Sequence, residues 1–186
     1  MNMSSRIDGS EDLSRAAASL RSRPEAAGKS DYEISTALAM PSRRRLMGRW
    51  EVQEHLVGGR PFLELFVSQQ LKGAGLVDGL YAASYEFREN ICIKKVSIDG
   101  LLPSSEGEIV YEYRLAVALS WRPGRGKSLI VTPEIGYQMS MLDGKPAACK
   151  DLPTSGEEQC LSWRYEGKDL VLEEGEDRKL LRKVRP

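Results

Sequence analysis

Large apolar and aromatic residues alternate with polar residues along most of the chain, from Gly48-Arg49-Trp50 to the segment that ends at Leu181-Arg182. A period of two residues is typical of a β-strand with one face toward a core and the other toward water. The clearest case is segment 109–121, in which Ile, Tyr, Leu, Val and Trp residues occupy every second position. Sustained over so many segments, the pattern predicts an antiparallel sheet that curls around a core or a cavity.

Turn dipeptides and glycines divide this pattern into about nine strands. The expected strands are 48–57, 80–88, 91–98, 109–121, 127–132, 135–141, 159–165, 169–173 and 178–184, with Asp99-Gly100 and Asp143-Gly144 as turns and 101–107 and 145–158 as loops. Pro61, with Phe62, Leu65 and Phe66 spaced three and four apart, predicts a short helix or a lid-like loop over 61–71. No helices separate the strands, which excludes a parallel α/β fold. An all-β, up-and-down barrel of eight or nine strands is favoured because closure removes exposed edges, and a two-sheet sandwich is the alternative.

Counting alternate positions assigns side chains to faces. The residues expected to line the inner face and to bind a ligand are Tyr81, Tyr85, Phe87, Tyr111, Tyr113, Tyr137, Met139, Met141 and Trp163. Because a buried tyrosine hydroxyl requires a hydrogen-bond partner, this lining predicts an amphipathic cavity suited to a planar or aromatic small molecule. The alternative is that these side chains simply fill the barrel.

The same count places the carboxylate of Glu54 inside and His55, the single histidine, outside. Glu54 is therefore a weak candidate for a catalytic acid or base, and the alternative places it at a wet mouth or a kink. His55 is expected to be an exposed surface residue. Enzyme motifs such as a nucleophile elbow, a P-loop or a dinucleotide fingerprint are absent from the sequence, so binding is favoured over catalysis.

The segment Gly48-Arg49-Trp50 resembles the Gly-x-Trp opening of lipocalin-like proteins of the calycin superfamily, and segment 163–172 resembles the closing hairpin of small bacterial members. The resemblance covers about residues 46–184. It implies a barrel whose first-strand tryptophan, Trp50, closes one end, with a basic residue near the last strand packed across its ring. Arg182 is the matching position and Arg178 a less suitable one. The Thr-Asp-Tyr motif of typical secreted lipocalins is missing, which points to a divergent member.

The composition limits the classes of partner that the protein is expected to bind. The chain of 186 residues has a formal net charge of zero, with 29% charged and 41% hydrophobic residues, so no general attraction to nucleic acid is expected. No apolar run approaches the roughly 18 residues of a membrane helix, and no spacing of histidines and cysteines suggests a metal or another cofactor. Cys149 and Cys160 flank a polar loop and are either bridged or two ordinary thiols.

Residues 1–42 differ from the rest because they are rich in Ser, Ala, Arg and Gly and poor in large apolar residues. They are expected to be a disordered or partly helical tail preceding the lipocalin-like domain at 43–186. A partner-binding arm is one alternative. In composition the tail also resembles the leader of type III secreted effectors, which would mean export by a non-classical route instead of the expected cytoplasmic location.

The three functional hypotheses are a barrel that binds a small lipophilic or aromatic ligand, a protein-interaction barrel without a ligand, and an isomerase- or cyclase-like enzyme.

Overall fold

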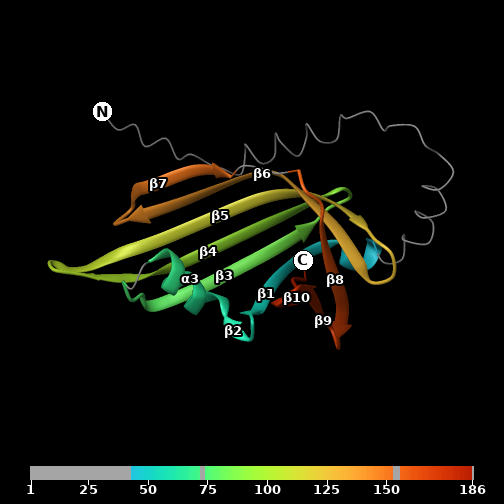
Figure 1. The fold of residues 1–186 in the computed structure, drawn as a ribbon, viewed down its shortest axis with the longest axis horizontal. Helices are drawn as coiled ribbons and strands as arrows, with labels where there is room; N and C mark the ends of the chain where they lie inside the picture. The colour runs from blue at the N-terminus through green and yellow to red at the C-terminus, as the bar shows by residue number, and fades with distance from the viewer. Residues whose placement is uncertain (1–42, 72–73, 153–155, 186) are drawn as a thin grey trace.

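The protein is an antiparallel β-barrel of eight strands, with two extra strands and one short helix after the first strand (Figure 1). The computed structural model describes residues 43–71, 74–152 and 156–185. The expected tail at 1–42 lies outside the described residues. The all-β barrel predicted from the alternating pattern is therefore confirmed, and the two-sheet sandwich is not the fold.

The strands are mostly joined by tight hairpins. In chain order the elements are β1 (Gly48–Val57), β2 (Arg60–Pro61), α3 (Phe62–Gln70), β3 (Val77–Phe87), β4 (Ile91–Ser104), β5 (Gly107–Pro123), β6 (Ser128–Leu142), β7 (Lys145–Leu152), β8 (Gln159–Glu166), β9 (Asp169–Glu174) and β10 (Asp177–Lys183). The sheet order is β10-β9-β8-β6-β5-β4-β3-β1, and β1 also pairs with β10. This last pairing joins the eight strands into a closed ring.

Strand lengths make the two ends of the barrel different. β4, β5 and β6 have 14, 17 and 15 residues, whereas β8, β9 and β10 have 8, 6 and 7. β1 pairs with β3 only as far as Glu51 opposite Ser84, and β6 pairs with β8 only as far as Val131 opposite Gln159. Beyond these points β3 to β6 continue as an overhanging sheet to which β7 adds (Figure 1). We call the region where the short strands stop and the overhang begins the mouth of the barrel.

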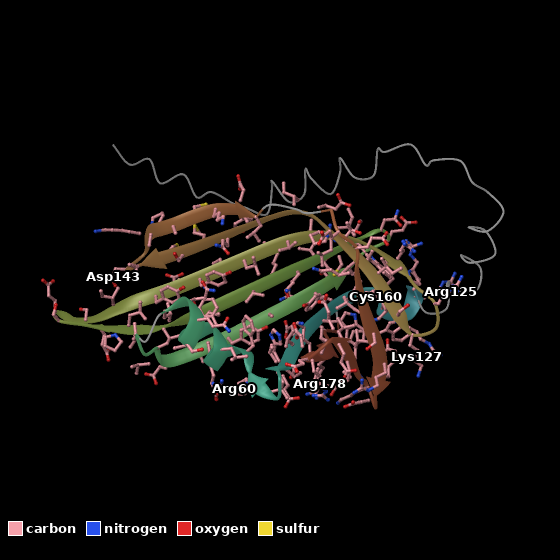
Figure 2. All side chains as sticks on the ribbon, in the orientation of Figure 1. Arg60, Arg125, Lys127, Asp143, Cys160 and Arg178 are labelled. Atoms are coloured by element: carbon pink, nitrogen blue, oxygen red, sulfur yellow. The ribbon has the colours of Figure 1, made fainter. Side chains whose placement is uncertain are left out.

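The length of the overhanging strands is visible in the positions of their turns. Asp143, in the turn between β6 and β7, lies at the opposite end of the molecule from Arg125, in the turn between β5 and β6 (Figure 2). α3 packs on the inner face of the overhang, as the spacing of its aromatic residues predicts. Within the described part of the chain, no helix is long and apolar enough to cross a membrane.

Two apolar clusters fill the interior. The first, at the closed end, consists of Leu46, Trp50, Tyr85, Phe87, Cys92, Leu119, Trp121, Leu129, Val131, Leu161, Trp163, Leu170, Leu172 and Leu181. The second lies under α3 and is built around Phe66, Ala83, Val96, Ile98 and Tyr111. Because most members of both clusters occupy inward positions of the strands, with Leu46 before β1 and Phe66 in α3 as additions, the hydrophobic effect fixes the register of the sheet.

Trp50 lies at the centre of the closed end. Its side chain is buried, and its indole nitrogen donates a hydrogen bond of 2.8 Å to the carbonyl oxygen of Leu46. The cation over its ring is Lys183, whose ammonium nitrogen lies 5.3 Å from the ring centroid and whose backbone is directly opposite Trp50. The expected contact with Arg182 is wrong, because Arg182 points to the other face and forms a salt bridge of 2.9 Å with Asp169.

Several segments expected to be turns, breaks or loops are parts of strands, including 101–104 of the expected loop 101–107, which continues β4. Asp99-Gly100 lies inside β4, where Gly100 is required because a Cβ atom would lie 2.7 Å from the side chain of Leu76. The segments 127–132 and 135–141 form one strand, β6, which continues through Pro133. Segment 145–152, expected to be a loop, is β7. All three cysteines are free thiols, with Cys92 buried.

Replacing Trp50 tests whether the closed end carries the stability of the barrel. We expect Trp50→Ala to lower the free energy of unfolding by about 3–5 kcal/mol, because it removes a large buried side chain and leaves a cavity. The neighbouring Arg49→Ala should change the free energy of unfolding by no more than about 0.5 kcal/mol, because Arg49 is exposed. Urea unfolding of both variants gives the comparison, and equal losses would contradict the assignment.

Candidate functional site

A one-residue irregularity in β1 decides which side chains enter the barrel. The pairing of β1 with β10 shifts between Val52 and Glu54, so the alternation of faces reverses there. His55 consequently points inward and is 9% exposed, whereas Glu54 points outward and forms a salt bridge of 2.6 Å with Arg178. The expectations of an exposed His55 and an inward Glu54 are both wrong. Glu54 therefore loses its basis as a candidate acid or base inside the barrel.

His55 is held from three sides. Its Nε2 lies 2.9 Å from Oδ1 of Asp177, and its Nδ1 lies 2.7 Å from the hydroxyl of Tyr81. The ring stacks on Phe62 of α3, with centroids 4.4 Å apart and planes at 7°. An ionised carboxylate only accepts hydrogen bonds, so Nε2 carries the proton toward Asp177, and in the neutral imidazole Nδ1 accepts from the Tyr81 hydroxyl. The imidazole thus links β1, β3, β10 and α3.

Asp177 is the shared acceptor of this group. Its second oxygen, Oδ2, lies 2.5 Å from the ammonium nitrogen of Lys179, which is almost fully buried. Burial by itself would raise the pKa of the Asp177 carboxyl, but the hydrogen bonds from His55 and Lys179 outweigh that effect and lower the pKa to about 2. Asp177 is therefore ionised at neutral pH, and it neutralises Lys179.

A second inward lysine has no such partner. Lys94 of β4 lies opposite Tyr85 of β3, and its ammonium nitrogen is 6.0 Å from the centroid of the Tyr85 ring. Among the described residues it forms no ion pair with a carboxylate. Burial lowers the pKa of Lys94, and the positive charge of Lys179 lowers it further. We call His55, Tyr81, Lys94, Asp177 and Lys179 the inner polar cluster.

The inner polar cluster lies between the two apolar clusters, at the mouth. Lys94, Val117, Gln138 and Asp177 all face inward by register, yet each keeps part of its accessible surface. A fully packed core would remove that surface. Burial also raises the pKa of Tyr81 well above its ordinary value, with a further contribution from Asp177, so its phenol stays protonated. The mouth therefore combines partly exposed inward side chains with several fixed hydrogen-bond donors.

Six of the nine residues predicted to line a binding site do face the interior. Tyr85, Phe87 and Trp163 belong to the closed-end cluster. Tyr111 and Tyr113 lie under α3, where the Tyr113 ring is 4.9 Å from that of Phe66. Tyr81 contacts His55. His55, Lys94, Asp177 and Lys179 were not among the predicted site residues, although Lys94, at an inward position of an otherwise apolar segment of β4, was a readable signal.

The other three predicted residues lie on the opposite face. Tyr137, Met139 and Met141 pair with outward positions of β5, Met139 for example with Arg114. The register of β6 against β5 shifts between Ala118 and Leu119, close to Pro133, so the assumed alternation does not hold across this strand. A proline within a strand commonly marks such a bulge, and it could have signalled this one.

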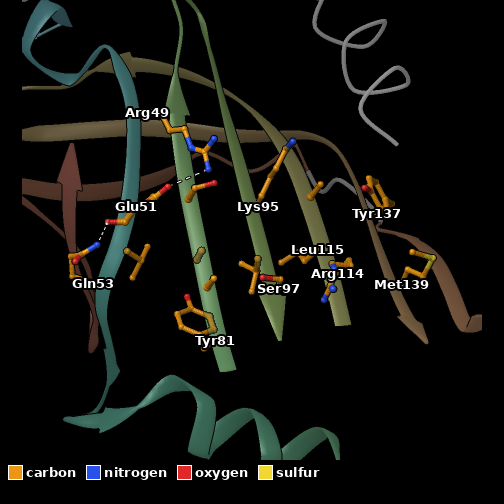
Figure 3. Close-up of a pocket in the computed structure, with 16 residues that line it drawn as sticks. Arg49, Glu51, Gln53, Tyr81, Lys95, Ser97, Arg114, Leu115, Tyr137 and Met139 are labelled. Atoms are coloured by element: carbon orange, nitrogen blue, oxygen red, sulfur yellow. Dashed lines mark hydrogen bonds and ion pairs between the residues drawn. The ribbon is translucent and has the colours of Figure 1, made fainter. Parts of the chain in front are cut away.

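Tyr137 and Met139 line a groove of about 410 Å³ on this outer face (Figure 3). Its other lining residues come from β1, β3, β4 and β5 and are about equally polar and apolar; the polar ones include Arg49, Glu51, Gln53, Ser84, Lys95, Ser97 and Arg114. Two of the cations in the groove form salt bridges, Arg49 with Glu51 at 3.2 Å and Arg114 with Asp99 at 2.6 Å, whereas Lys95 forms none among the described residues. The groove is a second concave surface, but its charges are largely neutralised and open to solvent.

Removing the Asp177 carboxylate should change how stability depends on pH. The folded-state pKa of about 2 lies below the ordinary value of 3.8. The stabilising contribution is therefore complete above about pH 4 and is lost as the pH falls toward 2. We expect Asp177→Asn to reduce this loss by about 1–2 kcal/mol, after allowance for solvent screening. Urea unfolding at a series of pH values measures it, with Asp78→Asn as the control. An unchanged slope would contradict the assignment.

Within the described residues, no group of three or more His, Cys, Asp and Glu side chains is placed to hold a metal ion. Comparisons with known proteins add no assignment: no family model, no curated protein and no solved structure matches this chain.

Proposed function

We propose that the protein binds a small molecule at the mouth of the barrel, with an apolar or aromatic body and a head group that accepts hydrogen bonds. The observation that carries the proposal is Lys94, a cation that faces the interior without a carboxylate partner among the described residues. An unpaired cation in such a place costs stability, and a ligand that supplies an acceptor removes that cost.

The surroundings suit the two parts of such a ligand. Phe62 and Phe66 of α3, together with Tyr113, provide aromatic surface at the mouth. Lys94 provides the donor for the head group, and the Tyr81 hydroxyl and the Lys179 ammonium lie in the same polar cluster. Small-molecule sites generally combine an apolar wall with a few convergent polar groups in this way.

The closed barrel, with Trp50 at one end and a cation across its ring, supports a relationship with lipocalin-like proteins. The relationship is part of the proposal, and it places ligand binding at the open end. In that case Lys183 takes the position for which Arg182 was expected.

A dye with an aromatic body and an anionic head tests the proposal. We expect anilinonaphthalene sulfonate to bind with saturable fluorescence enhancement, and Lys94→Met to weaken binding at least about tenfold, because a hydrogen bond to a charged group contributes about 1.5–3 kcal/mol. Lys95→Met is the matched control, since the adjacent lysine is exposed on the outer face. If Lys95→Met weakens binding and Lys94→Met does not, the outer groove is the site. An absence of saturable binding would favour a protein-interaction barrel.

The same substitution should stabilise the empty protein. Because burial lowers the pKa of Lys94, the folded state opposes protonation at neutral pH, and the free energy of unfolding rises with pH until Lys94 is neutral in both states. We expect Lys94→Met to increase the free energy of unfolding by about 1 kcal/mol or more at neutral pH. Urea unfolding of the original protein and of Lys94→Met, both without ligand, measures this difference. A clear loss of stability in Lys94→Met would show that Lys94 has a structural role.

A further inference from the structure

We propose that Lys94 is a nucleophile: its side-chain amine condenses with an aldehyde or ketone of the bound ligand to form an imine. The inference rests on the proposed function, because it names the head group of the same ligand as a carbonyl. It adds that the bound state is covalent and reversible.

The two inward lysines differ in the property that a nucleophile needs. Lys179 forms a salt bridge of 2.5 Å with Asp177, so its nitrogen is not available for nucleophilic attack. Lys94 contacts the Tyr85 ring and, among the described residues, no carboxylate. Burial and the neighbouring charge of Lys179 lower the pKa of Lys94 and outweigh the opposing charges of Asp177 and Glu174, so the net effect increases the share of neutral amine. Desolvation beside a second cation is a recognised way to activate an amine.

Imine formation requires proton transfers but no oxidant or reductant. The amine nitrogen attacks the carbonyl carbon, a C–N bond forms, and the carbonyl oxygen takes up a proton to give a carbinolamine. The nitrogen then loses its protons, the hydroxyl group leaves with one of them as water, and a C=N bond forms. The net change is one amine and one carbonyl converted to one imine and one water.

The inner polar cluster contains groups that can carry these protons. The imidazole of His55 lies between the Asp177 carboxylate at 2.9 Å and the Tyr81 hydroxyl at 2.7 Å. A proton taken up at Tyr81 can pass to Nδ1 while Asp177 stabilises the resulting imidazolium. The Lys179 ammonium is the nearby positive charge for the developing oxyanion. His55, Tyr81 and Asp177 thereby acquire a role beyond holding α3 against β1.

Reductive trapping tests the inference. The full-length protein is incubated with naphthaldehyde and cyanoborohydride, which reduces an imine to a stable amine, and the labelled peptide is identified by mass spectrometry. We expect one label per chain, with at least about tenfold more on Lys94 than on Lys95. Lys94→Met should lose this label, and Lys95→Met should keep it. Comparable labelling of Lys94 and exposed lysines, or the same labelling in Lys94→Met, would overturn the inference.

Lys94→Arg separates the two proposals, because arginine keeps the positive charge but does not form this imine. We expect Lys94→Arg to bind anilinonaphthalene sulfonate within about tenfold of the original protein and to lose the naphthaldehyde label. If the original protein binds the dye at the mouth but Lys94 takes no label, covalent binding is wrong and the proposed function stands. If neither occurs, both proposals fail.

We expect His55→Gln to slow labelling of Lys94 by a larger factor than it weakens dye binding, because His55 also contacts Phe62 and Tyr81 of the binding site. The rate of trapping is measured across pH, and the pH dependence of the original protein should flatten in this variant. An identical rate profile would show that His55 only holds Phe62 and Tyr81 in place.

Discussion

The antiparallel pairing of β1 with β10 is the interaction on which the rest of the structure depends. It joins the first and last strands of the barrel, so every other strand is closed into a ring only once it forms. At one end of this seam Trp50 is opposite Lys183 and seals the core. Toward the other end His55 is opposite Lys179 and forms part of the polar cluster. A single ladder of hydrogen bonds thus fixes both the stable end and the candidate site.

The register shift inside this ladder has a large effect because a strand has a period of two. One extra residue at Gln53 exchanges the faces of everything that follows in β1. Without it, Glu54 would enter the barrel opposite Lys179, and His55 would face water. With it, an imidazole enters and the carboxylate pairs with Arg178 outside, where desolvation costs little.

The inward side chains at the two ends of the barrel differ in polarity. At the closed end nearly every inward side chain is apolar, and two of the three indole nitrogens there, those of Trp50 and Trp121, donate to backbone carbonyls at 2.8 Å. At the mouth the chain places two lysines, a carboxylate, an imidazole and a phenol within the barrel. Only part of that charge is neutralised by direct contact, since Asp177 pairs with Lys179, and Lys94 forms no salt bridge among the described residues and feels Asp177 and Glu174 only at longer range. Buried charge without a direct partner lowers the stability of the folded protein. A ligand that supplies that partner can therefore bind with a larger favourable free energy here than elsewhere in the barrel.

The sequence by itself determined the fold class, the number and direction of most strands, the short helix after the first strand and the role of Trp50, because each depends on local periodicity or on a turn residue. It also placed Tyr81, Tyr85, Phe87, Tyr111, Tyr113 and Trp163 on the inner face, where no bulge interrupts the count. Only the tertiary structure decided the faces of Glu54, His55, Tyr137, Met139 and Met141, since each follows a register shift that depends on the partner strand. It alone brought His55, Tyr81 and Asp177 together, because strands far apart in sequence become neighbours only when the barrel closes.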